Sequence, residues 1–213
     1  MSFRGADLYA ALIHELKNEL GLLTHALDRI PRHEAEHDAA VDAARLMCQR
    51  VSGRLQQALM VYKSGSQPIH PVIDAWPPAD MVQAVADQAA ALANGRLQVA
   101  TELAPDLPDL WFYDRELVGM ALVNAVHNSL THARAKLTVR AGMVDGCLAF
   151  TVHDDSAGYP DAVLNGHVIG KASGTGLGLQ FSRLIAASHD NQGRHGELRL
   201  ANDGGAVFSL LLP

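Results

Sequence analysis

Hydrophobic positions in the first third of the chain recur at alternating spacings of four and three residues. They are Tyr9, Ile13, Leu16, Leu20, Leu23, Leu27 and Ile30, then Val41, Ala44, Cys48, Val51, Leu55, Ala58 and Tyr62. Each series is a heptad seam, the pattern of a helix that buries one stripe against a partner. Pro31 ends the first helix, which covers residues 3–30, because proline lacks the amide that the next turn would need. Residues 1–66 are therefore predicted to form an antiparallel helical hairpin.

The predicted hairpin has more apolar surface than it can bury alone. Each helix of a single hairpin covers one stripe, whereas two hairpins that pair as a four-helix bundle bury the seams fully. An uncovered seam of this length would be a large exposed apolar patch. The pattern therefore favours a homodimer formed through residues 3–63.

The remaining residues, 67–213, alternate helix and strand patterns after a linker rich in turn-forming residues at 64–78. Helical patterns cover 79–93, 115–133 and 177–188, and strand patterns cover 97–103, 110–112, 136–144, 147–153, 196–201 and 206–212. Asp145-Gly146 between two strand patterns is a hairpin signal. The predicted fold class is α+β: the helical hairpin precedes an α/β sandwich with a mixed or antiparallel sheet and helices packed on one face.

Composition narrows the class of protein. The formal net charge is −6, which argues against nonspecific nucleic-acid binding because that needs a basic surface. The longest apolar stretches fall short of the roughly 18 residues that cross a bilayer, and charged residues begin too early for a signal peptide. We therefore expect a cytoplasmic protein without a membrane segment. Cys48 and Cys147 are expected to be reduced, and they imply neither a disulfide framework nor a cysteine metal site.

The first candidate for chemistry is His14, in the segment HELKN. His14 and Asn18 are four residues apart, so they share a helix face that points away from the seam. Glu15 could accept the Nδ1 proton, which would leave Nε2 of His14 free as a nucleophile. The alternative is a solvated histidine on a polar helix face. A second histidine pair at this spacing, His33 and His37, could bind a metal, but a solvated turn is favoured because no third ligand is evident.

A pair of asparagines stands out in the predicted helix 115–133. Asn124 and Asn128 lie one turn apart on one face, although asparagine has poor helix propensity. A carboxamide oxygen suits Mg²⁺, which prefers oxygen ligands and also holds substrate phosphates and water. Two ordinary helix-surface asparagines are the competing interpretation.

Two glycine-containing segments follow strands. In DDSAGYP, Asp154 at a strand end could accept a hydrogen bond from an exocyclic amine, and Gly158 would let the backbone approach a ring; an ordinary turn fits too. In the second segment, Gly174, Gly176 and Gly178, with Thr175 among them, open a predicted helix. Amides at a helix N-terminus can gather around phosphate, although the spacing is neither that of a P-loop nor that of a dinucleotide fingerprint.

Together, and in this order, the four segments resemble the H, N, G1 and G2 boxes of histidine protein kinases over nearly the whole chain. The resemblance implies a dimerisation and histidine-phosphotransfer hairpin at 1–66 and an ATP-binding domain of the GHKL (Bergerat) type at 67–213. His14 would be the phospho-accepting residue and Glu15 its activating base. Asn18 would orient water for dephosphorylation of a response regulator.

The same resemblance implies the nucleotide contacts. Asn128 would bind Mg²⁺, with Asn124 one turn before it, and Asp154 would bind adenine, with Gly158 as a glycine of the same motif. The segment containing Gly174, Thr175, Gly176 and Gly178 would flank the triphosphate of ATP. Lys171 and His167 are the residues of the short lid, 161–173, that could offer positive charge to the γ-phosphate.

Four departures from the family pattern concern efficiency more than binding. Ser156 replaces the first glycine of the adenine motif, a change that should still fit. Thr131 stands where many members carry a cation directed at the phosphates. Glu19 replaces a helix-bending proline. The lid lacks the usual aromatic-rich segment.

We therefore expect a histidine protein kinase core that transfers phosphate from ATP to His14 and then to an aspartate of a response-regulator receiver domain. Because no sensory segment is evident, a separate sensory partner protein would supply the input. Three alternatives remain: a phosphotransfer hub whose ATP domain is vestigial, a response-regulator phosphatase that uses Glu15 and Asn18, and a binding module such as an anti-sigma-type partner switch. A binding module does not need a heptad hairpin with HELKN upstream.

Overall fold

The structure, a computed structural model of the full chain, describes residues 69–165 and 177–213 continuously, and isolated positions between 16 and 58. The chain divides into two compact units, Met1–Gln67 and Pro68–Pro213. In the first unit the described positions are helical except for a bend at Ile30. The predicted hairpin lies largely outside the described residues and stays a prediction, as does the homodimer built on it. Within the described ranges, none of the helices combines the length and the apolar character needed to traverse a bilayer.

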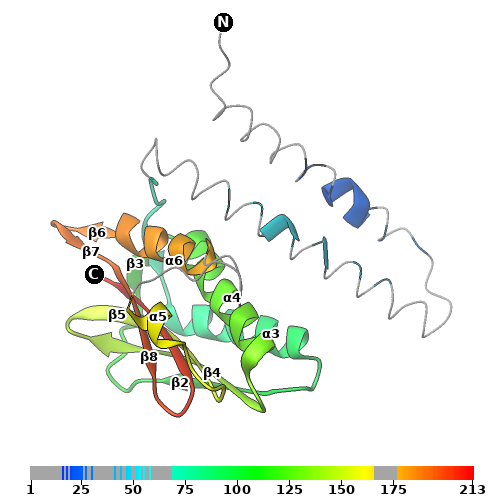
Figure 1. The fold of residues 1–213 in the computed structure, drawn as a ribbon. Helices are drawn as coiled ribbons and strands as arrows, with labels where there is room; N and C mark the ends of the chain where they lie inside the picture. The colour runs from blue at the N-terminus through cyan, green and yellow to red at the C-terminus, as the bar shows by residue number, and fades with distance from the viewer. Residues whose placement is uncertain are drawn as a thin grey trace, which may run out of the picture. The chain divides into compact units, whose positions relative to one another are not determined.

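The second unit is built on a five-stranded sheet with the strand order β2-β4-β5-β9-β8 (Figure 1). The strands are β2 (Gln98–Leu103), β4 (Lys136–Val144), β5 (Cys147–Asp154), β8 (Glu197–Asn202) and β9 (Ala206–Leu212). β2 runs parallel to β4, and the other neighbouring strands are antiparallel. The sheet is therefore mixed, which confirms one of the two predicted arrangements and excludes a purely antiparallel sheet.

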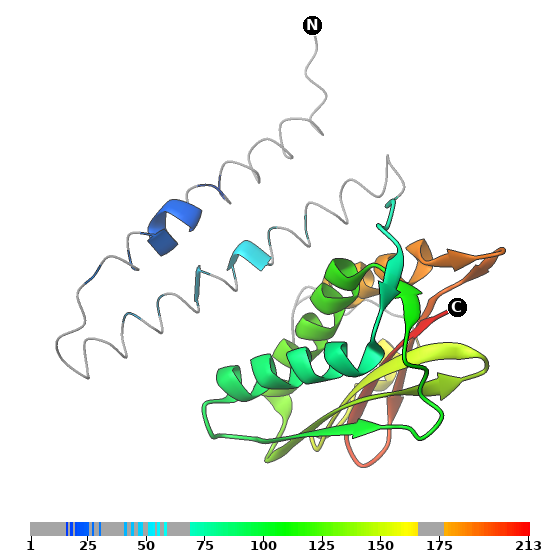
Figure 2. The ribbon, with the colours of Figure 1, turned by 180° about the vertical axis from the view of Figure 1, so that it is seen from behind.

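Helices form a second layer on one face of this sheet (Figures 1 and 2). They are α3 (Pro78–Ala93), α4 (Arg115–His132) and α6 (Leu177–Ser188), and each of the three predicted helices is present with ends within one residue. α4 begins where the carboxylate of Asp114 accepts the amide of Leu117 at 2.9 Å, a helix N-cap. α3 ends at Asn94, which adopts the left-handed conformation with φ 46, a common helix stop. Local sequence signals thus place both helix boundaries.

Short elements complete the unit. β1 (Asp74–Trp76) pairs with β3 (Trp111–Tyr113), β6 (Asp190–Asn191) pairs with β7 (Arg194–His195), and α5 (Asp161–Leu164) is a single turn. The prediction that residues 64–78 form a linker is wrong for 74–76, which make strand β1. These three residues lie among turn-forming residues and show no strand pattern of their own, and β1 pairs with the edge that β3 offers.

The core lies between the helices and the sheet. Its largest fully buried side chains include Tyr113, Leu122, Phe150, Phe181 and Phe208. The rings of Tyr113 and Phe150 meet edge to face with centroids 5.6 Å apart, a favoured aromatic geometry. Because these side chains fill the space between the layers, the helix-facing side of β5 is fixed in position up to the end of the strand.

Candidate nucleotide site

Asp154 is the last residue of β5, and its place in the strand decides where its carboxylate points. Leu148, Phe150 and Val152, at the alternate positions before it, are fully buried. Side chains alternate between the two faces of a strand, so Asp154 continues this row on the helix-facing side. It is 5% exposed. The carboxylate is therefore directed into the space between the layers.

Two backbone amides fix the orientation of this carboxylate. Oδ1 of Asp154 accepts hydrogen bonds from the amide of Ser156 at 2.9 Å and from that of Ala206 at 3.3 Å. No described residue donates a hydrogen bond to the second oxygen, Oδ2. A buried carboxylate with one oxygen saturated and one open can receive an N–H group of a ligand.

The neighbouring Asp155 forms hydrogen bonds with the main chain that follows α4. Its carboxylate accepts hydrogen bonds from the amides of Arg134 at 2.8 Å and of Ala135 at 3.0 and 3.1 Å. Desolvation alone would raise the pKa of Asp155, but the hydrogen bonds from Ala135, Arg134 and Lys136 outweigh it and lower the pKa. Asp155 therefore ties the segment after α4 to the end of β5, and of the two consecutive aspartates only Asp154 faces the helices.

The turn after Asp154 depends on a serine and a glycine. Oγ of Ser156 accepts the amide of Gly158 at 3.1 Å, so the serine closes the turn in place of the glycine typical of the resembled motif. Gly158 has φ +87, and a Cβ there would lie 2.6 Å from Cγ of Asn202. Both the backbone conformation and the close approach require glycine.

Tyr159 follows this glycine and is half-buried. Burial raises the pKa of Tyr159 above its usual value, and the negative charge of Asp154 raises it further. The phenol of Tyr159 is therefore protonated and uncharged near neutral pH.

Asn124 lies in the contact between α4 and α6. It is 8% exposed, and its Nδ2 lies 3.5 Å from Oγ of Ser182, which in turn donates to the carbonyl of Gly178 at 3.0 Å. A Cβ on Gly178 would lie 2.7 Å from Nδ2 of Asn124. Gly178 therefore lets α6 begin in direct contact with the Asn124 carboxamide, a packing role that its place in a glycine-rich segment did not reveal.

Asn128, one turn further along α4, is half-buried. Its carboxamide makes no hydrogen bond to any residue that the structure describes, so its oxygen is available to a ligand. Thr131 is uncharged, so no cation is present at that position. Its hydroxyl donates to the carbonyl of His127 at 3.0 Å. A carboxamide oxygen that no described residue engages fits Mg²⁺. Within the described ranges, no group of three or more His, Cys, Asp or Glu side chains could hold a metal ion.

Several predicted site residues lie outside the described residues: His14, Glu15, His33, His37, His167, Lys171, Gly174, Thr175 and Gly176. Asn18 is described and is an exposed helical residue. Of the predicted nucleotide contacts, the structure brings Asp154 and Gly158 together in one turn and Asn124 and Gly178 together between two helices.

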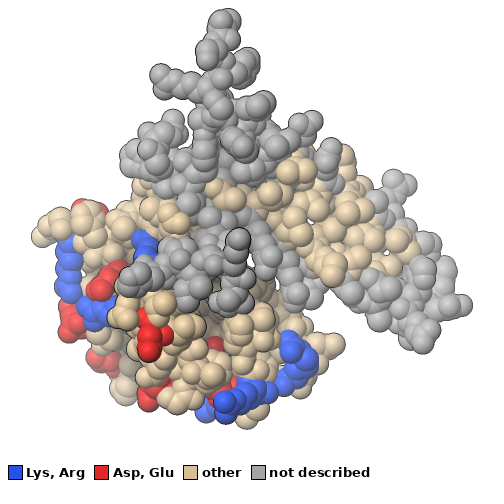
Figure 3. Space-filling model, in the orientation of Figure 1, with Lys and Arg blue, Asp and Glu red and all other residues tan. Residues whose placement is uncertain are grey.

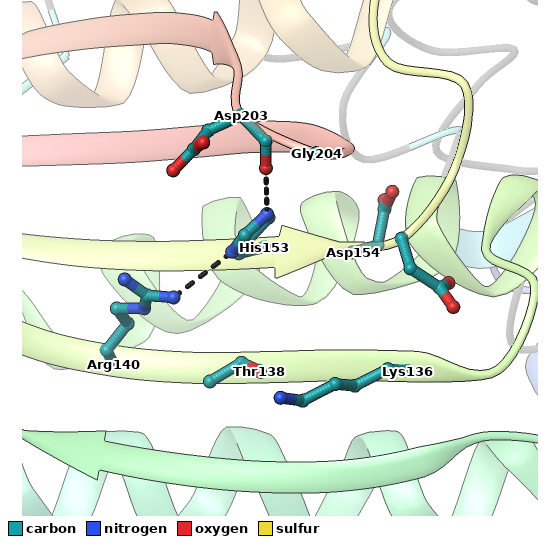
Figure 4. Close-up of a pocket in the computed structure, with 8 residues that line it drawn as sticks. Lys136, Thr138, Arg140, His153, Asp154, Asp203 and Gly204 are labelled. Carbon is teal, nitrogen blue, oxygen red and sulfur yellow. Dashed lines mark hydrogen bonds between the residues drawn. The ribbon is translucent and has the colours of Figure 1, made fainter.

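A cavity of about 210 Å³ lies on the other face of the sheet (Figure 4). The guanidinium of Arg140 donates to Nδ1 of His153 at 3.1 Å, and Nε2 of His153 donates to the carbonyl of Asp203 at 2.8 Å. His153 precedes Asp154 in β5, so their side chains leave opposite faces of the strand. Asp154 and Asp155 also line this cavity, so the cavity lies beside the end of β5, although His153 and Asp154 extend to opposite faces of the sheet.

Charges of both signs are interspersed on the face of the molecule seen in Figure 3. On β8, Arg199 pairs with Glu197 and with Asp145, each at 2.9 Å. These hydrogen bonds raise the pKa of the Arg199 guanidinium. The pairs neutralise one another on this exposed strand.

Sequence reasoning did not single out Asn202, although its side chain touches the turn at Gly158. An asparagine before Asp203-Gly204-Gly205 has the composition of an ordinary turn. Its partner is Tyr159, 43 positions earlier in the chain. A contact of that separation leaves no local signal.

One family model and several known proteins are similar to this chain. A family model described as "Histidine kinase-, DNA gyrase B-, and HSP90-like ATPase" matches residues 113–213. The chain is 27% identical over 193 residues to a probable sensor histidine kinase HK of Mycobacterium tuberculosis (strain CDC 1551 / Oshkosh), covering 87% of this chain and 49% of the relative. It is also 27% identical over 229 residues to the sensory histidine kinase/phosphatase NtrB of Salmonella typhimurium, covering 97% of this chain and 62% of the relative. The chain thus spans less than two thirds of either relative.

Solved structures share the fold. Full-length ShkA in complex with AMPPNP superposes with a TM-score of 0.73 at 22% identity, covering 97% of this chain and 45% of that chain. The nucleotide-free catalytic domain of the histidine kinase ThkA superposes with a TM-score of 0.55 at 17% identity, covering 66% of this chain and 97% of that chain. At these identities the likeness is one of architecture, with the same two-layer arrangement of helices on a mixed sheet.

Proposed function

Because this chain carries the ATPase core of a histidine kinase, we propose that it binds ATP at Asp154 and uses it to phosphorylate His14. The observation that carries the proposal is the Asp154 carboxylate, buried, held by two amides through Oδ1 and open at Oδ2. The exocyclic amine of adenine is an N–H donor that fits such an acceptor. Gly158 lets the turn after Asp154 take a positive φ and pack directly against Asn202.

The phosphates would lie toward the start of α6. Gly174, Thr175 and Gly176 immediately precede this helix, so their amides could surround the phosphates together with the positive end of the helix dipole. Lys171 would add charge at the γ-phosphate. Asn124 and Gly178 would contribute indirectly, because their contact fixes where α6 begins. Asn128 would hold Mg²⁺, which supplies charge neutralisation between the phosphates when bound.

The proposed reaction forms a P–N bond and breaks a P–O bond. Nε2 of His14 attacks the γ-phosphorus of ATP, and ADP leaves with the electrons of the broken bond. Glu15 takes the Nδ1 proton as positive charge develops on the ring. The phosphoryl group then passes from His14 to an aspartate of a response-regulator receiver domain.

Incubation of the intact chain with γ-labelled ATP tests this function. The wild type should acquire an acid-labile, base-stable label, the behaviour of a phosphoramidate. His14→Ala should abolish the label and leave ADP binding unchanged, whereas His25→Ala, a matched change at an exposed helical histidine of the same unit, should label normally. Asn128→Ala should also lose the label because the phosphates would lose their bridging cation. Labelling that survives in His14→Ala would refute the assignment.

A second candidate is a phosphotransferase or response-regulator phosphatase of the same fold. One observation favours it: Thr131 offers no cation and its hydroxyl is engaged with His127. The NtrB relative is described as a kinase/phosphatase. If the wild type takes up no label from ATP but accepts phosphate at His14 from a phosphorylated receiver domain, the relay is the correct function. Asn18→Ala should slow dephosphorylation of the receiver if the chain is a phosphatase.

We further propose that residues 1–66 form the dimerisation and phosphotransfer hairpin and that residues 67–213 form the ATP-binding domain. We also propose that the protein is a cytoplasmic homodimer whose activity is controlled by a separate sensory partner protein. The heptad spacing of both seams supports the hairpin and the homodimer, and the family match over residues 113–213 supports the ATP-binding domain. Sedimentation at micromolar concentration should give the mass of a dimer, and a monomer would contradict the proposal.

A further inference from the structure

The tip of the β8–β9 hairpin packs against the turn that follows Asp154. The carbonyl of Asp203 accepts Nε2 of His153 at 2.8 Å (Figure 4), and the amide of Ala206 donates to Asp154 at 3.3 Å. A Cβ on Gly205 would lie 2.7 Å from the carbonyl carbon of Asp154. The hairpin tip is therefore in close contact with the main chain on both sides of the proposed adenine acceptor.

One side chain of this tip holds the turn itself. Oδ1 of Asn202 accepts the amide of Tyr159 at 2.7 Å, and Nδ2 of Asn202 donates to the carbonyl of Tyr159 at 2.9 Å. The carboxamide thus satisfies both polar main-chain groups of a single residue, as a neighbouring strand would. A side chain with only a donor or only an acceptor could not do so.

The clamped residue ends the turn that follows Asp154. Ser156, at the start of this turn, donates its amide to Oδ1 of Asp154 at 2.9 Å. Gly158, between the two, has a positive φ and no side chain to resist movement. Within the turn, Oγ of Ser156 accepts the Gly158 amide, whereas the amide and the carbonyl of Tyr159 both bond to Asn202.

We infer that Asn202 is a positioning residue for the adenine-binding turn: through its two hydrogen bonds to the Tyr159 main chain it holds the turn at Gly158 in place beside Asp154, and so it contributes to affinity for adenine nucleotides. The inference rests on the proposed function, because it assumes that adenine binds at Asp154. Asn202 is itself exposed, so its hydrogen bonds contribute little to folding, whereas their loss frees the turn.

The experiment compares Asn202→Ala, Asn202→Asp and the control Asn191→Ala in the full chain. Asn191 is an exposed asparagine of β6 outside the proposed site. Calorimetric titration with ADP and with GDP, each with Mg²⁺, gives the dissociation constants. Asn202→Ala should weaken ADP binding by about fivefold to thirtyfold, the worth of one or two neutral hydrogen bonds, and bind GDP no worse than the wild type. Asn202→Asp should lose at least as much, because its second oxygen would face the Tyr159 carbonyl. Asn191→Ala should bind both nucleotides as the wild type does.

Two further readouts separate positioning from a structural role. Hydrogen exchange at the Tyr159 amide should accelerate in Asn202→Ala while the melting temperature stays within a few degrees of the wild type. In the labelling assay, KM for ATP should rise and kcat should be unchanged, since the phosphates and His14 are not touched. A large loss of melting temperature together with equal loss of ADP and GDP binding would overturn the inference.

The two proposals fail in different ways. If the wild type does not bind ADP, the proposed function falls and the inference falls with it. If the wild type binds ADP, Asp154→Asn does not, and Asn202→Ala binds as tightly as the wild type, the inference alone is overturned.

Discussion

Replacement of Asp154 by asparagine gives the sharpest test of the nucleotide site, because the structure dictates how the new carboxamide must sit. Oδ1 receives two backbone amides, from Ser156 and Ala206. In Asp154→Asn the carboxamide oxygen must keep this place, because an NH₂ group there would face two donors. Nδ2 then replaces Oδ2, the atom that we propose accepts the adenine amine. The substitution therefore turns the acceptor into a donor while it preserves the contacts to the protein.

The magnitude follows from this geometry. A hydrogen bond to a charged acceptor contributes about 1.5–3 kcal/mol, so its loss should weaken ADP binding by between about tenfold and about 150-fold. The two amides keep an acceptor, now neutral, so the free energy of unfolding should fall by no more than about 1–2 kcal/mol. The expected signature is a large loss of affinity with a modest loss of stability.

Calorimetric titration with ADP and Mg²⁺, together with urea unfolding of the same samples, measures both quantities. Asp145→Asn is the control, because Asp145 is an exposed acid of the β4–β5 turn whose partner is Arg199; its ADP affinity should equal that of the wild type. Asp154→Ala should bind no better than Asp154→Asn and should be less stable, because both amides lose their acceptor. If Asp154→Asn folds and binds ADP as tightly as the wild type, adenine does not bind at Asp154.

Two other predictions concern stability. Gly178→Ala should lower the free energy of unfolding by about 1–3 kcal/mol, because the new Cβ overlaps the Asn124 carboxamide. In a double-mutant cycle measured by urea unfolding, much of this cost should disappear in the Asn124→Ala background. Additive effects of the two substitutions would contradict the contact. His189 is 3% exposed, its Nδ1 donates to the carbonyl of Ile185 and its Nε2 accepts the amide of Asp114, and burial lowers its pKa. The unfolded chain therefore binds a proton more readily at His189, so the free energy of unfolding should fall as pH decreases below about 6.5 and through the lower folded pKa. Urea unfolding from pH 8 to pH 5 should show a shallower fall in the free energy of unfolding for His189→Gln than for the wild type. An equal fall in both would exclude His189 as the cause.

Local pattern was sufficient for most of the elements in the second unit. The alternation over 136–144 predicted β4 with its observed ends, and the predicted helices at 79–93 and 115–133 agree with α3 and α4 within one residue. Burial of one face makes apolar residues recur every 2 residues in a strand and every 3.6 residues in a helix. This recurrence can be recognised within a short stretch of consecutive residues. The short strands β1, β6 and β7 were not predicted, whereas the equally short β3 was predicted at 110–112, one residue from its observed bounds.

Sequence alone also located Asp154 and the glycine of its turn as candidates, because a polar residue that ends a buried strand and a glycine that permits a close approach have local signatures. It determined the residue types that could meet a nucleotide. It also predicted the face shared by Asn124 and Asn128, since that depends on helical periodicity alone.

Tertiary structure decided which of those residues do what. The sequence singled out Asp154 but did not show what its neighbour Asp155 does: the register of β5 directs Asp154 toward the helices, and the Ala135 and Arg134 amides engage Asp155. The parallel pairing of β2 with β4 and the contact of Asn202 with Tyr159 join segments far apart in the chain. Such contacts depend on how the elements pack, because a hydrogen bond between distant residues requires no pattern at either end.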